Sequence, residues 1–224
     1  MTGFDYTGKE NLDAMALAVA YNQTIYRWLK RDLRSTDAIL EYGAGKGEYC
    51  NRFKEFRIQA VELDADMHSS IACPAVRDID EAEGDFDFIY AVNVLEHIKD
   101  DAATVQKFHR RLRPGGRVKI FVPARMELFS NMDTLVGHER RYHPGELKGL
   151  FSDGGFRVLD CRYFDFLGYF ATLAYKLSRG GGEVSPASIR LYDSFVFPIS
   201  KLIDAITRGR LIGKNLVFEA VRVD

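Results

Sequence analysis

The sequence AILEYGAGKG at residues 38–47 decides the fold. A short apolar run ends in Glu41, and glycines follow at positions 43, 45 and 47. Apolar residues then recur with helical spacing at Cys50, Phe53 and Phe56. Glycines in such a loop allow the backbone to turn tightly and to approach a ligand closely. The stretch therefore predicts a strand, a ligand-binding loop and a helix, in that order.

The rest of the chain continues the alternation of strands and helices. We expect strands at 58–63, 74–77, 86–92, 118–122, 156–164 and 216–223, and helices at 11–34, 65–71, 102–112 and 144–152. The first of these helices is expected to break near Tyr21 and Asn22. Strands that alternate with helices form a mostly parallel sheet with helices on both faces. The predicted fold class is therefore α/β, with a Rossmann-like sheet.

The length of 224 residues, 46% of them hydrophobic, suits one core. We expect a single domain over 1–224, with an N-terminal cap helix over 11–34 and a helical, lid-like insertion over 165–213 that contains a hinge-like Gly180-Gly181-Gly182. A long excursion in a compact domain is usually a lid, a binding element or an oligomer contact. The aromatic residues of the insertion equally suit core packing. A lid, a dimer interface and a membrane-surface helix stay open, and so does the oligomeric state.

Charge and cysteine content limit the partners. Lys and Arg number 31 against 32 Asp and Glu, so no global field attracts nucleic acid, which we exclude as a partner. The three cysteines lack metal-ligand spacing, and we expect no metal and a reducing compartment. The N-terminus does not resemble a signal peptide, and no apolar run reaches the roughly 18 residues of a membrane span. We expect a cytoplasmic protein without a transmembrane segment, with peripheral membrane contact left open.

The glycine loop differs from a dinucleotide fingerprint at one position. The pattern G-x-G-x-x-G/A, counted from Gly43, requires a small residue where the chain has Glu48. A pyrophosphate there would meet Glu48 and Glu41, and two like charges 4 Å apart repel by about 4 kcal/mol at an effective dielectric near 20. A cationic ligand is favoured instead. S-adenosylmethionine carries an ammonium and a sulfonium, and the glycine amides can bind its carboxylate.

Further acids follow the next two predicted strands. Glu62 lies 19 residues after Gly43, where a carboxylate can accept hydrogen bonds from both ribose hydroxyls. Asp78 follows the third strand and suits the adenine amino group, with Ile79 packing beside the ring. Each acid alone could be an ordinary solvated carboxylate. Acids at three successive strand ends point to an adenosine cofactor.

Five segments in order, EYGAGKG, VELDADM, RDI, FDFIYAVNVLEHIKDD and LRPGGRVKIFVP, resemble the motifs of class I S-adenosylmethionine-dependent methyltransferases. The resemblance covers about residues 20–125 and implies a seven-stranded sheet whose last strand is antiparallel. It implies S-adenosylmethionine as cofactor, S-adenosylhomocysteine as product, and cofactor contacts at Glu41, Gly43, Ala44, Gly45, Gly47, Glu62, Leu63, Asp78, Ile79 and Asn93. The segment with Tyr21 resembles an aromatic segment that closes over the methionine end of the cofactor in such enzymes.

The acceptor should lie beyond the carboxyl ends of the fourth and fifth strands. Methyl transfer from a sulfonium is a direct displacement, so the protein mainly aligns the acceptor and removes a proton where needed. His97 is a candidate general base, although it could simply orient its loop. Glu96 is interpreted as a structural or solvated carboxylate. No cysteine or serine has the partners of a nucleophile.

A second candidate acceptor element is GHERRYHP at residues 137–144. His138 is the first choice of base, Arg140 or Arg141 would steer an anionic acceptor, and Tyr142 would hydrogen-bond it. The His-x-Arg-Arg-Tyr pattern is similar to segments near the mouth of the acceptor site in this superfamily. A solvated loop whose arginines pair with carboxylates is the alternative.

The function predicted from these features is methyl transfer from S-adenosylmethionine to oxygen or nitrogen of a small molecule. A similarity to bacterial methyltransferases encoded with glycan-building enzymes favours a sugar or glycan-pathway intermediate, and a quinone or other lipid is the alternative acceptor. Two other classes remain: a non-catalytic scaffold that binds S-adenosylmethionine, and an NAD(P)-dependent oxidoreductase. Glu48 and the lack of a recognisable catalytic tyrosine-lysine pair disfavour the oxidoreductase.

Overall fold

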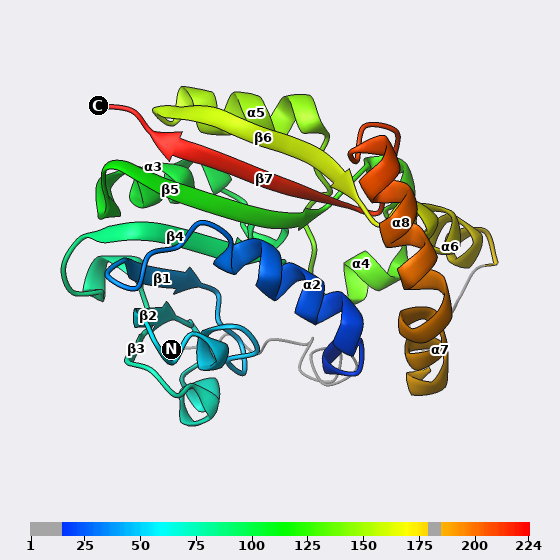
Figure 1. The fold of residues 1–224 in the computed structure, drawn as a ribbon, viewed down its shortest axis with the longest axis horizontal. Coiled ribbons are helices and arrows are strands. Elements are labelled where there is room, and N and C mark those ends of the chain that lie inside the picture. Colours follow the sequence, from blue (N-terminus) through cyan, green and yellow to red (C-terminus); the bar gives the residue numbers. More distant parts are fainter. Residues whose placement is uncertain (1–14, 179–184) are drawn as a thin grey trace.

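The computed structural model describes residues 15–178 and 185–224 (Figure 1). The expected glycine hinge at 180–182 and the first residues of the predicted helix 11–34 lie outside the described residues. The described chain contains a seven-stranded sheet in the order β3-β2-β1-β4-β5-β7-β6. The strands are β1 (Ala38–Tyr42), β2 (Arg57–Val61), β3 (Ala75–Val76), β4 (Phe86–Val92), β5 (Leu112–Pro123), β6 (Phe156–Phe164) and β7 (Asn215–Arg222).

The strand directions confirm the expected topology. Strands β1 to β5 run parallel to one another, and β7 is antiparallel to both β5 and β6. Parallel neighbours bring their carboxyl ends to the same edge, so the chain leaves β2, β1, β4 and β5 along one side of the sheet. This edge is where ligands bind in open α/β sheets.

Helices cover both faces of the sheet, as predicted. Helix α2 (Val19–Lys30) lies on one face, and α3 (Asp101–Arg111) and α5 (Pro144–Asp153) lie on the other (Figure 1). Ile39 packs in the cluster with α2, whereas the adjacent Leu40 packs in the cluster with α3 and α5. Successive strand residues point to opposite faces, so a strand buried on both sides is a continuous apolar run.

Two helix predictions near the N-terminus need correction. No α-helix follows the glycine loop; residues 48–56 form turns and the short 3-10 helix η1 (Cys50–Arg52) before β2 begins. Cys50 and Phe53 are buried there and Phe56 is partly buried, but the connection is too short for a helix that spans the sheet. Helix α2 begins at Val19, so the break lies at residues 17–18 and not at Tyr21 and Asn22.

A lysine from the centre of the sheet holds the C-terminal end of α2. The Lys119 side chain on β5 is buried, and its Nζ donates to the carbonyl oxygens of Trp28, Leu29 and Arg31 at 2.8, 3.3 and 2.9 Å. The last carbonyls of a helix have no partner within the helix. Lys119 supplies one and thereby fixes α2 on the sheet.

The remaining short elements position the loops that follow the strands. They are the 3-10 helices η2 (Ala65–Ser70), η3 (Ile79–Glu81), η4 (Leu95–His97) and η5 (Met126–Leu128), and helix α4 (Asn131–Leu135). The described residues contain no helix that is both long and apolar enough to cross a membrane.

The insertion is helical, as predicted, and lies beyond one end of the sheet (Figure 1). It comprises α6 (Phe166–Leu177), α7 (Pro186–Leu191), the π-helical turn η6 (Tyr192–Val196) and α8 (Phe197–Thr207). Asp193 accepts hydrogen bonds from the backbone amides of Ala20 and Tyr21 at 2.8 and 2.9 Å, and so caps α2. The insertion is therefore tied to the cap helix, and its role as a lid stays a prediction.

Candidate active site

The glycine loop after β1 has a backbone that favours glycine at three positions. Gly43, Gly45 and Gly47 have φ angles of +76°, +54° and +82°. A β-carbon on Gly43 would lie 2.4 Å from Val94 Cγ2, and one on Gly47 would lie 2.6 Å from Asn51 Nδ2. Glycine at position 43 therefore lets the loop touch the segment that follows β4.

Hydrogen bonds fasten this loop to the end of β2. The amides of Gly43 and Ala44 donate to the Val61 carbonyl, and the Gly45 amide donates to Glu62 Oε2 at 2.7 Å. Glu62 Oε1 accepts from the Asp64 amide at 2.9 Å. Glu62 thus joins the first loop to the second strand, at the position where the sequence places it beside the cofactor ribose.

Glu41 supports the loop from inside the protein. Its carboxylate is buried, and Oε2 accepts from the Cys50 amide at 2.9 Å. Burial raises the pKa of Glu41 to about 8, although the hydrogen bonds from Cys50 oppose this. Glu48 is paired with Arg52 at the surface. The repulsion argument against a pyrophosphate therefore loses its basis, because no helix N-terminus exists here and Glu48 is neutralised.

The residues expected at the adenosine end lie after β2 and β3. Leu63 is 49% exposed, which suits contact with a ring, whereas Ile79 is fully buried in the core. Asp78 caps η3 through the Asp80 amide and accepts from Lys107 Nζ, both at 2.9 Å. The hydrogen bonds from the Asp80 amide and from Lys107 hold the pKa of Asp78 below its usual value.

Asn93, directly after β4, completes the expected cofactor edge. It is exposed, has a φ of +54°, and its amide donates to the Phe121 carbonyl at 2.8 Å. Because β2, β1 and β4 are neighbours, the glycine loop, Glu62 and Asn93 lie along one edge. These residues fit an adenosine cofactor at this edge, with a carboxylate for the ribose and a close-approach loop for the methionine end.

Tyr21 is held in the core. Its ring packs against Phe121, Phe164 and Phe197, and its hydroxyl donates to Asn215 Oδ1 at 2.9 Å. Contact between Tyr21 and the methionine end of the cofactor stays a prediction. The neighbouring Asn22 makes the link from α2 to the loop region instead, because its Oδ1 accepts from the Tyr49 hydroxyl at 3.2 Å.

The two candidate bases meet at the carboxyl end of β4. His97 ends η4, His138 follows α4, and their ring centroids lie 4.6 Å apart at an interplanar angle of 77°. The Glu139 amide donates to the Glu96 carbonyl at 2.8 Å and so fastens the two segments together. Burial and the nearby His138 lower the pKa of His97 to about 4. His97 is therefore neutral at pH 7.

Asp133 orients His138. Its Oδ1 lies 2.7 Å from His138 Nδ1, and Arg141 donates to both carboxylate oxygens, at 2.8 and 3.1 Å. Burial alone would raise the pKa of Asp133, but the hydrogen bonds from His138 and Arg141 hold it at about 2. A carboxylate only accepts hydrogen bonds, so Nδ1 of His138 carries the proton and Nε2 presents a lone pair.

Both arginines of the second element pair with carboxylates, as in the alternative interpretation, and the tyrosine also contacts an acid. Arg141 is buried against Asp133. Arg140, whose side chain is 32% exposed, pairs with Asp101 at 2.8 Å. The Tyr142 hydroxyl donates to the same Asp101 carboxylate at 2.8 Å, and burial raises its pKa. The loop is not simply solvated, however, because Arg141 and Tyr142 are both buried.

Glu96 lies in the candidate site, although the sequence analysis gave it no chemical role. Of the two interpretations, a structural or a solvated carboxylate, the solvated one is wrong, because Glu96 is fully buried. Neither of its oxygens has a hydrogen-bond partner among the described residues, and His138 Nε2 lies 3.8 Å from Oε1. Burial raises the pKa of Glu96 to about 8. Its place between the apolar Leu95 and Ile98, directly after a buried strand, was the available signal.

Comparisons with known proteins agree with the predicted family and cofactor. A family model described as "Methyltransferase domain" matches residues 16–160. The chain is 28% identical over 187 residues to a Mycolicibacterium smegmatis protein named "Probable S-adenosylmethionine-dependent methyltransferase", and 26% identical over 182 residues to Rv3030 of Mycobacterium tuberculosis, named likewise. These matches cover 77% and 75% of this chain, and 68% and 65% of the relatives, so the chain spans about two thirds of their length.

Solved structures show the same fold. An S-adenosylmethionine-dependent methyltransferase from Mesorhizobium loti superposes with a TM-score of 0.61 at 16% identity, over 92% of this chain and 100% of that one. Phosphoethanolamine N-methyltransferase 2 of Haemonchus contortus, in complex with S-adenosyl-L-methionine, gives 0.58 at 18% identity, over 92% of this chain and 53% of that one. The family match covers most of the chain and includes the glycine loop and Glu62. The chain therefore belongs to the class I S-adenosylmethionine-dependent methyltransferases.

Proposed function

We propose that this protein transfers the methyl group of S-adenosylmethionine to oxygen or nitrogen of a small-molecule acceptor. The observation that carries the proposal is the pair of His97 and His138 at the carboxyl end of β4. Val94, three residues before His97, lies against Gly43 of the cofactor loop. The segment that packs against the cofactor loop is therefore followed, three residues later, by one member of the candidate acid–base pair.

The residues of the chain have separate tasks in this reaction. Bound S-adenosylmethionine supplies an activated methyl group, so the protein needs no nucleophile. The glycine loop and Glu62 hold the cofactor, while the histidine pair removes a proton from the acceptor. Asp133 fixes the orientation of His138 through the 2.7 Å hydrogen bond, as carboxylates do for catalytic histidines. Orientation of the reactants alone can lower the barrier by about 7–11 kcal/mol.

A sugar or glycan-pathway intermediate is the acceptor that the sequence resemblance favours. Arg140 supports an acceptor with an anionic group, because its guanidinium is partly exposed and shares Asp101 with Tyr142. A panel of hydroxyl-bearing and amine-bearing acceptors, with and without phosphate, tests this choice. Methyl transfer to none of them, with S-adenosylhomocysteine still bound, would favour the scaffold alternative.

A lipid or quinone acceptor is the second candidate, and the outer face of the insertion favours it. Five apolar side chains, each 56–74% exposed, follow one another at steps of three or four residues along α7, η6 and α8: Leu191, Phe195, Ile199, Leu202 and Ile206. Such spacing forms one stripe along a helix. We name it the apolar stripe.

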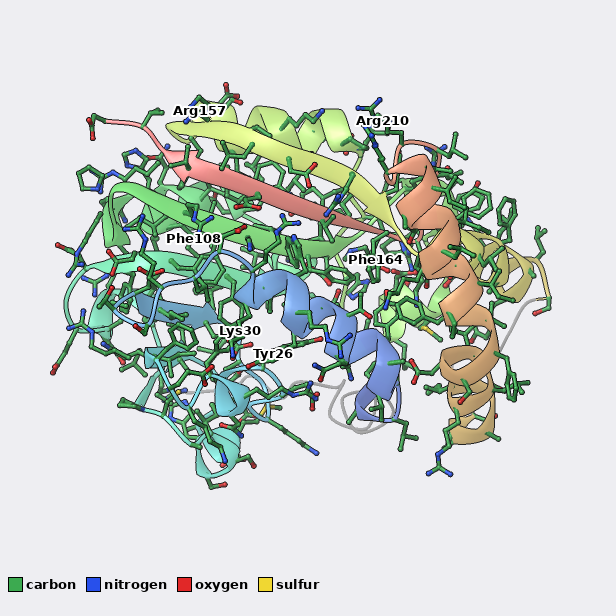
Figure 2. The ribbon with its side chains drawn as sticks, in the orientation of Figure 1. Tyr26, Lys30, Phe108, Arg157, Phe164 and Arg210 are labelled. Carbon is green, nitrogen blue, oxygen red and sulfur yellow. The ribbon has the colours of Figure 1, made fainter. Side chains whose placement is uncertain are left out.

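The charges around the apolar stripe are basic. The exposed charged residues of segment 185–211 are Arg190, Lys201, Arg208 and Arg210, and Figure 2 shows Arg210 beyond the end of α8. The two acids of the segment face inward: Asp193 caps α2, and Asp204 accepts from the amides of Asp165 and Phe166. A helix with an apolar face and basic flanks suits a membrane surface with anionic lipids.

Sedimentation with vesicles tests this second candidate. We expect the protein to sediment with phosphatidylglycerol vesicles and much less with phosphatidylcholine vesicles. The double variant Leu202→Glu, Ile206→Glu should lose this binding, whereas Leu159→Glu, at an exposed position on β6, should keep it. Equal binding by both variants would show that the apolar stripe does not bind lipid. A dimer that the double variant abolishes would instead show that the stripe contacts a second copy of the chain.

Calorimetric titration tests the main proposal. S-adenosylhomocysteine should bind the purified protein at micromolar concentration, and NADH should not bind. The absence of a binding signal with S-adenosylhomocysteine would overturn the proposal. His138→Ala should retain S-adenosylhomocysteine binding and lose methyl transfer, because the residue belongs to the acceptor side and not to the cofactor edge.

A further inference from the structure

We propose that Glu96, His97 and His138 form a binding site for a divalent transition-metal ion such as Zn²⁺. One ligand atom from each of the three residues lies within 4.8 Å of the others. Two imidazoles and one carboxylate are the ligand set of many catalytic zinc sites. The spacing in the sequence does not indicate such a site, because His138 comes from a different loop.

Glu96 supplies the first argument. Its carboxyl group has no exposure and no hydrogen-bond partner among the residues described. Burying such a group lowers the stability of the fold, unless the group binds a ligand. An imidazole nitrogen, His138 Nε2, lies 3.8 Å from Glu96 Oε1, which is longer than a hydrogen bond. The gap between these two atoms suits an ion that both contact.

The orientation of the histidines supplies the second argument. His138 Nδ1 lies 2.7 Å from Asp133 Oδ1, and His97 Nδ1 lies 3.3 Å from the Gly137 carbonyl oxygen. Both oxygens are acceptors, so each Nδ1 carries a proton and each Nε2 presents a lone pair. Metal-bound histidines are oriented in this way by a carboxylate or a carbonyl at the other ring nitrogen. Asp133 and Gly137 occupy these supporting positions here.

The donor set selects the kind of cation. Imidazole nitrogens favour zinc and similar transition metals, whereas magnesium and calcium prefer oxygen ligands alone. Ligand atoms around zinc lie about 2.0–2.2 Å from the ion, and therefore roughly 3.3 Å from one another. Small rotations of side chains would bring the present atoms to that spacing. Three protein ligands leave one position of a tetrahedral zinc ion open.

The role of the ion rests on the proposed function. With the ion bound, the two histidines are ligands and no longer act as the base. An acceptor hydroxyl in the open position would then lose its proton to solvent, and more readily than without the ion, because a bound zinc ion lowers the pKa of oxygen ligands. The oxygen electron pair then forms the new O–CH₃ bond, and the pair of the broken C–S bond stays on sulfur. The inference therefore assigns a hydroxyl-bearing acceptor to this enzyme.

Metal titration of untagged protein tests the site without any measurement of activity. After dialysis against a chelator, the wild-type protein should bind one Zn²⁺ per chain in calorimetry. Glu96→Gln and His97→Ala should each weaken binding by at least about 10-fold, whereas His109→Ala should not. His109 is a matched control, because its Nε2 contacts the Val223 carbonyl on a different part of the surface. Equal Zn²⁺ binding by all these proteins would overturn the site.

A second variant distinguishes the loss of a metal ligand from misfolding, because it is expected to gain a spectroscopic signal. His97→Cys would replace one nitrogen ligand by a thiolate, and the Co²⁺-loaded variant should show a sulfur-to-cobalt charge-transfer band that wild-type protein lacks. Absence of the band in a folded, Co²⁺-loaded variant would exclude position 97. S-adenosylhomocysteine titration of the same samples separates the two proposals. Its binding without Zn²⁺ binding overturns only the metal site, and no S-adenosylhomocysteine binding overturns the proposed function.

Discussion

A β-carbon on Gly43 would lie 2.4 Å from Val94 Cγ2, so glycine at the end of β1 is what allows the segment after β4 to pack against the cofactor loop. The φ of Gly43 is +76°, which also favours glycine. Val94 is the N-cap residue of η4, the short helix that contains Glu96 and His97. The contact thus connects the edge that binds the donor to the residues proposed to act on the acceptor.

Gly43→Ala should therefore impair both stability and cofactor binding. Clash and backbone strain together should lower the free energy of unfolding by about 2–4 kcal/mol, and the affinity for S-adenosylhomocysteine should fall at least about 10-fold. Gly84→Ala is the matched control, because Gly84 has a φ of +77° and no atom within 4 Å of an added β-carbon. It should cost only about 1–2 kcal/mol. Equal losses in urea unfolding would remove the Val94 contact from the explanation.

Glu62→Ala should weaken the binding of S-adenosylhomocysteine by about 1.5–3 kcal/mol, the usual contribution of a hydrogen bond to a charged group. Part of this loss comes from the loop, because Glu62 also accepts from the Gly45 amide. Calorimetry of Glu62→Ala beside Glu55→Ala, an exposed acid paired with Lys30 on another surface, measures the difference. An affinity equal to that of the wild type would show that Glu62 does not bind the ribose.

Glu41 should make the protein less stable as the pH rises. Its pKa is about 8 in the folded protein and 4.5 in an unfolded chain, so folding retains a proton that the unfolded chain releases. The stability from Glu41 is complete below pH 4.5 and is lost as the pH rises through about 8. Glu41→Gln keeps an acceptor for the Cys50 amide but lacks the proton. Urea unfolding between pH 5 and 8 should show a smaller decline for Glu41→Gln, and parallel declines would contradict the prediction.

Arg140 and Arg141 should differ in what their removal does. Arg141→Ala removes the guanidinium that donates to both oxygens of the buried Asp133 and should cost about 3–5 kcal/mol of unfolding free energy. Arg140→Ala breaks a more exposed pair with Asp101 and should cost at most about 1 kcal/mol. Thermal unfolding measures both. If Arg140 steers an anionic acceptor, Arg140→Ala should raise the KM for that acceptor at an unchanged affinity for S-adenosylhomocysteine; a KM as in the wild type would remove this role.

Strands were the most predictable elements. Phe86–Val92 and Phe156–Phe164 have the bounds that their apolar patterns indicated. The first is nearly continuous because a central parallel strand is buried on both faces. The helix predicted after the glycine loop is absent from the structure, although the prediction also relied on buried apolar residues. Apolar residues at 50 and 53 are buried as predicted, but burial alone does not determine a helix when the next strand begins at Arg57.

The acceptor side was less predictable, because its contacts join separate segments. Arg141 and Tyr142 were chosen for their chemistry, yet their partners Asp133 and Asp101 turn them toward the interior. Glu96 was passed over because a glutamate is rarely buried without a partner. Nothing in the spacing of the chain shows that η4 and the loop after α4 touch.

The sheet, the glycine loop and the family could be predicted from local patterns in the sequence, because periodic burial and backbone strain act on residues that are close along the chain. Which polar groups meet depends on the packing of distant segments. The tertiary structure brought His138 beside His97 and Glu96, since the carboxyl ends of neighbouring strands converge at one edge regardless of their distance in the sequence. It also neutralised Glu48 with Arg52, and it turned both acids of the insertion away from the apolar stripe. Contacts between distant segments depend on how the whole chain packs, and no local sequence pattern predicts this packing.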